Sequence, residues 1–328
     1  MPEKLLQAKD ISPRRDRAEV LNGAPVAEVI KREAAEEIAR LRDEHGVRPC
    51  LSVVRVGDDP ASAVYVRNKV RACEAIGLRS EHHALAETTA TAQLLDLIQS
   101  LNKRDDVDGI LVQLPLPRGV DEARVLEAVD AEKDVDGFHP LNVGRLALGQ
   151  PALAPCTPAG IVELLARSGI EMGGANACIV GRSNIVGRPL AQLLLQRDAT
   201  VTICHSRTQN LATVTREADI LIAAIGRAGF IKAEHIKPGA TVIDVGINKV
   251  ADEKTARVLF GADELDKRLD TIAKRGYTLV GDVHPAEADM VAGRRTPVPG
   301  GVGLLTVAML MKNTIKAAMR RRKLQFNE

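Results

Sequence analysis

Three residues that could take part in proton transfer recur at helical spacing in the segment PASAVYVRNK. Ser62, Tyr65 and Lys69 follow one another at intervals of three and four residues. In a helix these intervals place the side chains on one face. A lysine partly withdrawn from water changes its pKa readily and can act as a general acid or base beside a tyrosine. Because such pairs are also common on exposed helix faces, this one indicates catalysis only together with other groups.

Two further segments place polar side chains where α/β proteins usually bind ligands. Val112 and Gln113 end an apolar run, and the following LPLP must leave regular structure because two prolines cannot sit in a central strand. Asp134 and Asp136 lie in the loop DVDGF. Strand ends and loops commonly carry ligand groups, and Asp136 is suited to accept hydrogen bonds from an amino-pyrimidine edge. For Asp134 we favour a turn or capping role.

A proline- and glycine-rich segment, TPVPGGVG at 296–303, precedes the last expected helix. Its candidate contact residues are Pro299, Gly300, Gly301 and Gly303. Prolines make such a loop rigid, and glycines let the backbone approach a planar ligand closely. The alternative is an ordinary crossover between domains.

The segment GRSNIVG at 181–187 lies between an expected strand and an expected helix. Glycine permits a tight turn, and the free N–H groups of a helix N-terminus attract a phosphate. The spacing differs from the standard G-x-G-x-x-G, so a tight turn without a ligand is the alternative. The candidate contacts here are Gly181, Arg182, Ser183, Ile185 and Gly187. Lys69 precedes this loop by more than 100 residues, whereas the Y-x-x-x-K of short-chain dehydrogenases follows it, so that assignment fails.

The end of the next expected strand favours NADP over NAD. NAD sites usually place an acidic residue there to bind the ribose hydroxyls, but this chain has His205, Ser206 and Arg207. A guanidinium pairs well with the 2′-phosphate that distinguishes NADP. The alternative for Arg207 is a solvated cation at a helix start. Gly226 closes the third strand at a point where the chain can pass the cofactor closely.

Helix and strand patterns alternate along the chain, which indicates an α/β protein. Its 328 residues suggest two domains, since single cores rarely exceed roughly 250–300 residues. We expect a tail at 1–20, a first domain at 21–150, and a Rossmann-like domain with a parallel sheet at 151–301. A last helix at about 302–320 is expected to return to the first domain, so that 302–328 completes it. The segment 249–280 is charged and irregular, with weak helical character at 262–274.

The remaining elements follow from hydrophobic periodicity and from glycine and proline positions. The expected strands are 51–56, 79–85, 108–113, 177–180, 199–204, 220–225 and 241–245, and the expected helices are 24–44, 60–77, 91–102, 157–169 and 187–196.

Composition argues against several classes of partner. The formal charge of +2, from 45 basic and 43 acidic residues, gives no reason to expect nucleic acid or a membrane surface. No apolar stretch of about 18 residues indicates a membrane span, and the polar N-terminus lacks the apolar centre of a secretory signal. Five cysteines without a C-x-x-C pair indicate reduced thiols in the cytoplasm and no metal site. The basic run at 320–323 is expected to be a solvated end.

Taken together, these segments resemble the bifunctional methylenetetrahydrofolate dehydrogenase/cyclohydrolase family, called FolD in bacteria. The resemblance spans about residues 20–320 in the family's order. The matching strings are VGDDPASAVYVRNK at 56–69, DGILVQLPLP at 108–117, KDVDGFHPLNVGRL at 133–146, PCTPAG at 155–160, VGRSNIVGRP at 180–189, CHSRT at 204–208, DVGIN at 244–248, GDV at 281–283 and TPVPGGVG at 296–303.

The resemblance implies an enzyme of one-carbon metabolism. It would oxidise 5,10-methylenetetrahydrofolate with NADP and hydrolyse the methenyl product to 10-formyltetrahydrofolate, in a cleft between the domains of a homodimer. Lys69 would assist proton movements, Tyr65 would orient the folate, Gln113 would hold Lys69, and Asp136 would bind the pterin. Ser62, Val112, Leu114, Pro299 and the 300–303 loop would border the folate. Residues 181–187, His205, Ser206, Arg207, Gly226 and Ile247 would hold NADP.

Two features depart from the family pattern. The family usually continues TPVPGGVGPMT, but this chain has Leu304 in place of the proline. The segment 249–280 is longer than the usual connection and is expected to form an extra surface hairpin or helix. Two rival functions are another two-domain oxidoreductase, such as a shikimate- or amino-acid-dehydrogenase-like enzyme, and a non-catalytic NADP-binding protein. The first rival does not account for Tyr65, Lys69, Gln113 and Asp136 together with the 296–303 loop, and the presence of Lys69 and Gln113 argues against the second.

Overall fold

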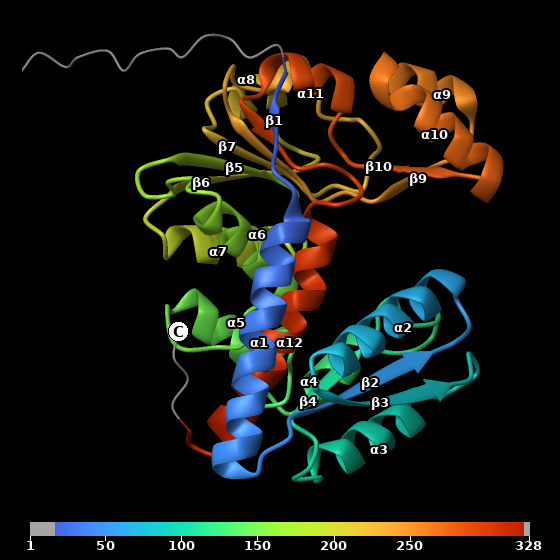
Figure 1. Cartoon of the computed structure of the whole chain (residues 1–328), viewed down its shortest axis with the longest axis vertical. Coiled ribbons are helices and arrows are strands. Elements are labelled where there is room, and N and C mark those ends of the chain that lie inside the picture. The colour runs from blue at the N-terminus through green and yellow to red at the C-terminus, as the bar shows by residue number, and fades with distance from the viewer. Residues whose placement is uncertain (1–16, 325–328) are drawn as a thin grey trace, which may run out of the picture.

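The computed structural model describes residues 17–324, which form two α/β domains joined by a pair of long helices (Figure 1). The expected tail at residues 1–16 lies outside the described residues. The tail was expected to extend to residue 20, but Glu19–Val20 form strand β1, which pairs with β11 (Arg294–Arg295). Backbone N–H and C=O groups at the edge of a sheet can pair with any extended segment. A two-residue strand can therefore form there without a hydrophobic pattern that would reveal it in the sequence.

The first domain is built around a small parallel sheet in the order β3-β2-β4. The central strand β2 is almost wholly buried, as an apolar run covered on both faces should be. The elements are α1 (Gly23–His45), β2 (Cys50–Val56), α2 (Pro60–Ala75), β3 (Arg79–Leu85), α3 (Thr91–Asn102), β4 (Gly109–Val112), α4 (Glu122–Ala128) and α5 (Pro140–Ala147). All the strands and helices expected up to residue 113 are therefore present.

The second domain contains a six-stranded parallel sheet in the order β1-β11-β8-β7-β5-β6. Its elements are α6 (Cys156–Arg167), β5 (Asn176–Val180), α7 (Gly187–Leu195), β6 (Thr200–Cys204), α8 (Leu211–Thr215), β7 (Ile220–Ala223), the 3₁₀ turn η1 (Ala233–His235), β8 (Thr241–Asp244) and α11 (Pro285–Val291). The chain passes from β5 to β6 on one side and then to β7 on the other. Such a reversal opens a crevice at the carboxyl ends of the strands, and the expected Rossmann-like arrangement is confirmed.

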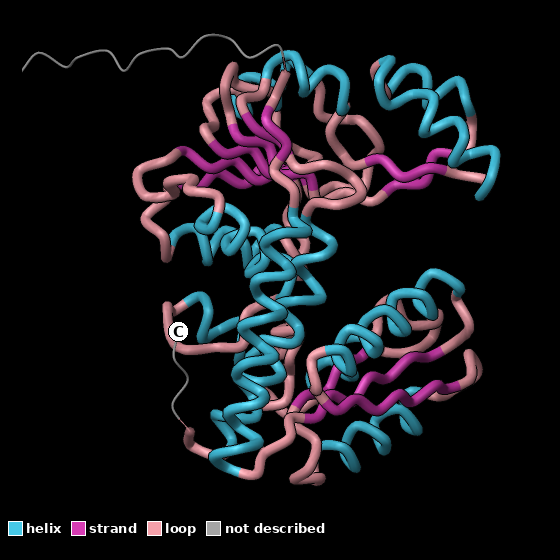
Figure 2. The backbone as a smooth tube through the Cα atoms, viewed as in Figure 1, coloured by secondary structure: helices cyan, strands magenta, loops and turns pink. Residues whose placement is uncertain are grey.

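An insert projects from the second domain at residues 248–280 (Figure 2). It consists of an antiparallel pair, β9 (Asn248–Val250) with β10 (Thr278–Val280), and two helices, α9 (Glu253–Leu259) and α10 (Ala262–Arg275). A hairpin or a helix was expected; the insert contains helices, and its two antiparallel strands are joined through them and not by a turn. It has its own small apolar core, which includes Phe260 and Ile272.

The last helix, α12 (Val302–Arg321), packs against α1, α6 and the first domain's sheet. It therefore returns to the first domain as expected, while also contacting the second (Figure 1). By length and composition α12 could cross a membrane, which the sequence reading had overlooked. However, 67% of the most apolar 18-residue stretch of α12 is buried inside the protein, as in the core helix of a soluble domain.

The basic end of α12 is not a solvated run, contrary to expectation. Arg321 and Arg322 each donate a hydrogen bond to Oδ1 of Asp108, at 2.9 and 2.5 Å. Asp108 is fully buried, and its other oxygen accepts from the Cys50 N–H at 3.1 Å. A buried carboxylate requires such partners, so these arginines fasten α12 to the first domain's sheet.

The five cysteines are all buried and free. Cys178 and Cys204 lie on the neighbouring strands β5 and β6, with their sulfur atoms 3.7 Å apart. Within residues 17–324, no group of three or more histidine, cysteine, aspartate or glutamate side chains is arranged to hold a metal ion.

Candidate active site

Lys69 and Gln113 come from different elements and meet in the first domain. Lys69 lies on α2, which begins at Pro60 and is capped by Asp59 through the Ser62 N–H at 2.7 Å. Gln113 follows the carboxyl end of β4. Lys69 Nζ donates to Gln113 Oε1 at 3.1 Å, and Gln113 Nε2 donates to the Leu114 carbonyl at 2.7 Å. The second bond fixes which way the Gln113 amide faces, so its oxygen is presented to the lysine.

The other two residues of the α2 face have different surroundings. Ser62 is buried in the first turn. The Tyr65 side chain is 47% exposed and makes no hydrogen bond within the described part of the chain. An exposed aromatic ring one turn from a held lysine offers a flat surface for stacking a planar ligand.

Asp134 and Asp136 share a loop, but only Asp134 has its carboxylate satisfied by hydrogen bonds. Asp134 Oδ2 accepts from the His139 N–H at 2.8 Å and from Asn142 Nδ2 at 2.9 Å, which is the turn role expected for it. Asp136 keeps some solvent-accessible surface but is otherwise enclosed by protein. Burial raises its pKa to about 6, while the charge of Lys69 acts in the opposite direction. Asp136 therefore lies close to Lys69 and keeps free acceptor capacity.

The loop that carries Asp136 is held from the last helix. Asn313 of α12 donates to the Val135 and Ala154 carbonyls, each at 2.8 Å. At Gly137 the φ angle is +72°, and an added Cβ would approach the Leu153 carbonyl oxygen to 2.6 Å. Sequence reasoning assigned Asn313 no role. The only feature of the sequence that could have indicated this role is a polar residue on the buried face of an apolar helix.

The GRSNIVG loop connects β5 to α7 by a very close turn. Gly181 has φ +131°, and a Cβ there would come within 2.1 Å of the Ala224 carbonyl oxygen. A Cβ at Gly187 would come equally close to the Gly181 carbonyl oxygen. Ser183 Oγ accepts from the Val186 N–H at 3.1 Å and from the Gly187 N–H at 3.5 Å, and the Gly181 N–H donates to the Cys204 carbonyl at 2.9 Å. The backbone N–H groups of residues 182–185 have no acceptor in the described part of the chain and remain for a ligand. The spacing of the two glycines is thus set by packing within the turn.

Further expected cofactor residues follow the neighbouring parallel strands, whose carboxyl ends meet at one edge of the sheet. His205 Nδ1 accepts from the Arg207 N–H at 3.1 Å and so shapes the turn after β6. Arg182, Ser206 and Arg207 are exposed. Within residues 17–324, neither arginine is paired with an acidic side chain, so both remain available to an anion.

The Gly226 turn after β7 is held by Asp282, a residue of the family-like GDV string at 281–283 for which the sequence predicted no role. Asp282 Oδ2 accepts from the Ile225 and Gly226 N–H groups at 2.6 and 2.9 Å. Its Oδ1 accepts from the Arg227 N–H at 2.8 Å and from Asn248 Nδ2 at 2.9 Å. This buried carboxylate therefore uses all its acceptor capacity to shape the crevice.

A cavity of about 520 Å³ lies between the two domains. Leu114 and Phe138 line it from the first domain, and Asn184, Ile185 and Arg188 line it from the second. Its size is that of a small-molecule pocket. Two expected ligand residues, Leu114 for folate and Ile185 for the cofactor, therefore face a common space.

The proline- and glycine-rich loop joins β11 to α12. The Gly300 carbonyl accepts from the Gly23 N–H at 3.0 Å, so α1 and α12 begin side by side. Gly303 is close to the exposed Ile247: a Cβ at Gly303 would lie 3.9 Å from Ile247 Cδ1. Leu304 is 41% exposed at the start of α12. The expected folate and cofactor residues thus adjoin one another here.

A pair of hydroxyls next to this loop was missed from the sequence. Thr157 of α6 and Thr306 of α12 have their Oγ1 atoms 2.9 Å apart. They are 149 positions apart in the chain, so only the tertiary structure brings them together. Val112, by contrast, was expected to contact folate, but its side chain is buried in the core on the α3 side. Only its main chain is available to a ligand.

Comparisons with known proteins agree with both domains. Residues 21–136 match the model of the tetrahydrofolate dehydrogenase/cyclohydrolase catalytic domain, and 155–322 match that of the NAD(P)-binding domain. The bifunctional protein FolD of Koribacter versatilis is 57% identical over 305 residues, covering 93% of this chain and 98% of that protein.

Solved structures agree as well. The FolD dehydrogenase/cyclohydrolase of Campylobacter jejuni aligns with a TM-score of 0.83 at 41% identity, over 93% of this chain and 99% of that one. The Trypanosoma brucei FolD, solved with NADP and an inhibitor, aligns with a TM-score of 0.83 at 38% identity, over 94% and 99% of the two chains. The chain belongs to the tetrahydrofolate dehydrogenase/cyclohydrolase family, with that family's catalytic and NAD(P)-binding domains.

Proposed function

We propose that this protein oxidises 5,10-methylenetetrahydrofolate with NADP and then hydrolyses the methenyl product to 10-formyltetrahydrofolate. The observation that carries the proposal is the Lys69–Gln113 hydrogen bond of 3.1 Å beside the partly enclosed Asp136, in the catalytic domain of a member of this family. A non-catalytic binding protein would have no need of a lysine held with free proton-transfer capacity.

The second domain would hold NADP at the carboxyl ends of its strands. Residues 181–187 would bind the diphosphate through backbone N–H groups, and Ser206 and Arg207, with Arg182, would bind the 2′-phosphate. Gly226 and Ile247 would border the rest of the cofactor. When bound, NADP would be the hydride acceptor for the methylene carbon. The fit is supported by the close turn at Gly181 and by Arg182 and Arg207, which pair with no acidic side chain among the described residues.

The first domain would position the folate so that this carbon faces the cofactor. Tyr65 would stack on the folate, and Asp136 would accept hydrogen bonds from the amino-pyrimidine edge of the pterin. The loop formed by Pro299, Gly300, Gly301 and Gly303 would border the substrate from the other domain. Holding the two reacting carbons in near-contact is the main contribution that such a cleft makes to hydride transfer.

Hydrolysis would rest on Lys69. Its Nζ would take one proton from the attacking water and return it to the ring nitrogen as the ring opens, while the water's second proton is released to solvent as the formyl carbonyl forms. Gln113 would hold Nζ in place through its amide oxygen. One group could therefore serve both halves of the hydrolysis.

We also propose the domain limits and the assembly. The first domain would comprise 21–150 and 302–328, and the second would comprise 151–301. A homodimer is supported by β6, an edge strand on which Ile203 is 39% exposed. A cytoplasmic location is supported by five buried, free cysteines. Neither nucleic acid nor a membrane is proposed as a partner, in keeping with the near-zero net charge.

The deciding experiment is a spectrophotometric assay of the purified protein with 5,10-methylenetetrahydrofolate, run with NADP and then with NAD. Hydrolysis of added methenyltetrahydrofolate is followed separately. We expect turnover with NADP, weaker turnover with NAD, and hydrolysis without added cofactor. Folded protein that binds NADP but performs neither reaction would overturn the proposal in favour of a binding protein.

A further inference from the structure

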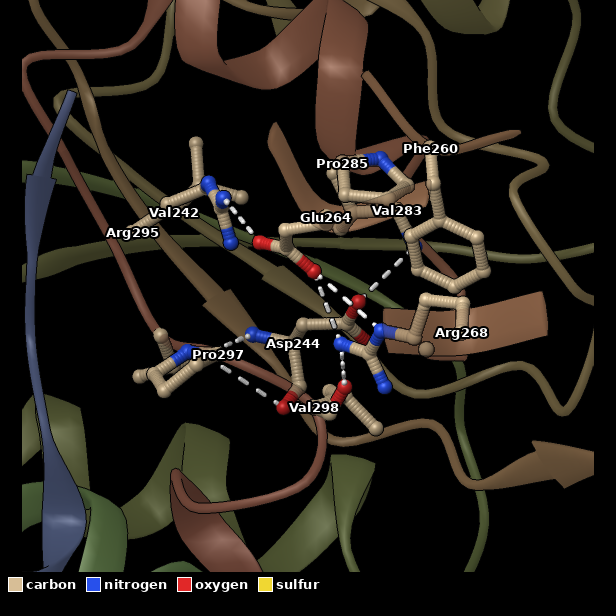
Figure 3. Close-up of a pocket in the computed structure, with 12 residues that line it drawn as sticks. Val242, Asp244, Phe260, Glu264, Arg268, Val283, Pro285, Arg295, Pro297 and Val298 are labelled. Carbon is tan, nitrogen blue, oxygen red and sulfur yellow. Dashed lines mark hydrogen bonds and ion pairs between the residues drawn. The ribbon is translucent and has the colours of Figure 1, made fainter. Parts of the chain in front are cut away.

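The insert at 248–280 contacts the loop that precedes α12. Arg268 of α10 reaches out of the insert towards Val298, which lies between Pro297 and Pro299 (Figure 3). Its guanidinium Nη2 donates to the Val298 carbonyl at 3.0 Å, and Nη1 donates to the Leu279 carbonyl at 3.1 Å. One side chain thus connects the loop to the base of the insert.

The Arg268 guanidinium is itself held firmly. It lies over the Phe260 ring at 4.5 Å and is only 16% exposed. Glu264, one turn earlier on α10, accepts from Arg268 Nε and Nη2 at 3.2 and 2.9 Å. An arginine stacked on an aromatic ring and paired with a carboxylate loses little further freedom when it bonds the two carbonyls.

The network continues into the strand that leads to the loop. Glu264 Oε1 lies 3.6 Å from Arg295 Nη2 on β11. Arg295 is in turn bound by Asp289 through two hydrogen bonds of 2.5 and 2.8 Å. The insert therefore contacts both the start of the loop, at Arg295, and its middle, at Val298.

The start of the loop is fixed by Thr296, whose N–H donates to the Val242 carbonyl at 3.0 Å and whose Oγ1 accepts from the Asp244 N–H at 2.8 Å, but the residues after it have fewer partners. Pro297 and Pro299 have no N–H group, so neither can donate a hydrogen bond. Two of its carbonyls are bound from outside: Val298 by Arg268 and Gly300 by the Gly23 N–H. Removing the Arg268 contact would leave the segment before Pro299 without its only side-chain donor in the described part of the chain.

We propose that Arg268 is a positioning residue for the substrate loop, and that the α9–α10 insert exists in this chain to provide it. The inference rests on the proposed function, because it assumes that Pro299 to Gly303 border the folate. Arg268 acts through the Val298 carbonyl and touches no reacting atom. Its loss therefore weakens folate binding and leaves NADP binding unchanged.

The first test compares Arg268→Ala with Arg257→Ala. Arg257 is an exposed arginine of the same insert whose 3.4 Å ion pair with Glu253 stays within α9. For Arg268→Ala we expect KM for 5,10-methylenetetrahydrofolate to rise about tenfold, with KM for NADP changed less than about twofold, as the loss of one charged hydrogen bond implies. Arg257→Ala should match the parent protein. An unchanged folate KM in a folded Arg268→Ala protein, or equal rises for both substrates, overturns the inference.

Two further measurements apply if Arg268→Ala does not fold. Arg268→Lys retains the charge but cannot span the Leu279 and Val298 carbonyls and Glu264 together, so we expect a smaller rise confined to the folate KM. In the parent protein, saturating tetrahydrofolate should slow amide exchange at 262–280 while leaving α3 unaffected. No slowing at 262–280 contradicts the inference. If the parent protein itself shows no folate turnover, the proposed function has failed instead, so the two failures are distinguishable.

Discussion

Two polar clusters in this protein use their buried charges in opposite ways. In the Lys69 cluster (Lys69, Gln113 and Asp136), the lysine has one hydrogen-bond partner among residues 17–324, which is Gln113, and no backbone N–H of that range donates to Asp136. In the aspartate cluster (Asp244 and Asp282), Asp244 accepts from three backbone N–H groups and Asp282 accepts four hydrogen bonds in all. Burial raises the pKa of Asp136 to about 6 and that of Asp244 to about 7.

A raised carboxyl pKa therefore does not by itself distinguish a catalytic group from a structural one. What differs between the clusters is the hydrogen-bonding capacity that remains. Asp244 and Asp282 have their oxygens occupied by the backbone of the loops that form the cofactor crevice, so they hold shape. Lys69 and Asp136 keep hydrogen-bonding capacity beyond the contacts that they make, so they can act on a ligand.

The largest expected effect is at Lys69. Lys69→Ala should lower the rate of methenyltetrahydrofolate hydrolysis by about 10²–10⁴-fold, the usual contribution of a general acid–base group. NADP affinity and the urea midpoint should stay close to those of the parent, because Lys69 is not part of the core. Steady-state hydrolysis, fluorescence titration with NADPH and urea unfolding measure these three properties. Full hydrolysis by the variant would contradict the proton-transfer role.

The next largest effect is expected at Asp282. Asp282→Ala leaves three backbone N–H groups and the Asn248 amide without their acceptor, so we expect a loss of about 3 kcal/mol or more in the free energy of unfolding. Asp270→Ala is the control, since Asp270 only forms an exposed pair with Lys274; it should change stability by less than about 0.5 kcal/mol. Urea denaturation measures both. Equal stabilities would mean that the aspartate cluster does not hold the crevice.

A smaller effect is expected from the pH dependence of Asp136. Because its pKa is about 6 in the folded protein, above the ordinary value of 3.8, ionisation opposes folding. This cost is absent below about pH 4 and fully present above about pH 6. The parent should therefore lose about 1–2 kcal/mol of stability relative to Asp136→Asn as the pH rises from 4 to 7, allowing for partial solvent access. Asp244 titrates in the same direction in both proteins, so its contribution to the pH dependence of stability cancels in the comparison.

Urea unfolding of the two proteins across this pH range is the measurement. A difference in stability that stays flat with pH would mean that Asp136 is ionised in the fold at no cost. Asp134→Asn is not an equivalent control. Both the His139 N–H and the Asn142 amide donate to Asp134, and the NH₂ group of an asparagine there would place a donor against these donors.

The smallest effect is expected at Leu304, the departure from the family pattern. Leu304 is the third residue of α12 after the Gly301 cap, where the N–H has no partner within the helix, so a proline is tolerated. Leu304→Pro should raise stability by no more than about 1 kcal/mol through the unfolded state, and kcat/KM should stay within about twofold. A large gain in activity would show instead that leucine loosens the substrate loop.

The sequence by itself determined the order of the elements, the α/β class and the separate pieces of the site. Hydrophobic runs, glycine turns and helical spacing are local signals, so β2, α2, the GRSNIVG turn and the face bearing Ser62, Tyr65 and Lys69 could be inferred from neighbouring residues. The insert was recognised as extra, and the turn role of Asp134 was expected. These inferences needed no knowledge of which segments come together.

Only the tertiary structure decided which groups share an environment. Asp108 binds Arg321 and Arg322, Thr157 meets Thr306, and Asp282 holds the Gly226 turn, each across a long separation in sequence. Arg268 and Val298, and likewise strands β1 and β11, are brought together only by the fold. A hydrogen bond between distant segments leaves no periodic trace in either one, because each residue type is equally compatible with solvent. Burial and partnership, which separate a structural charge from a reactive one, arise only when the chain is packed.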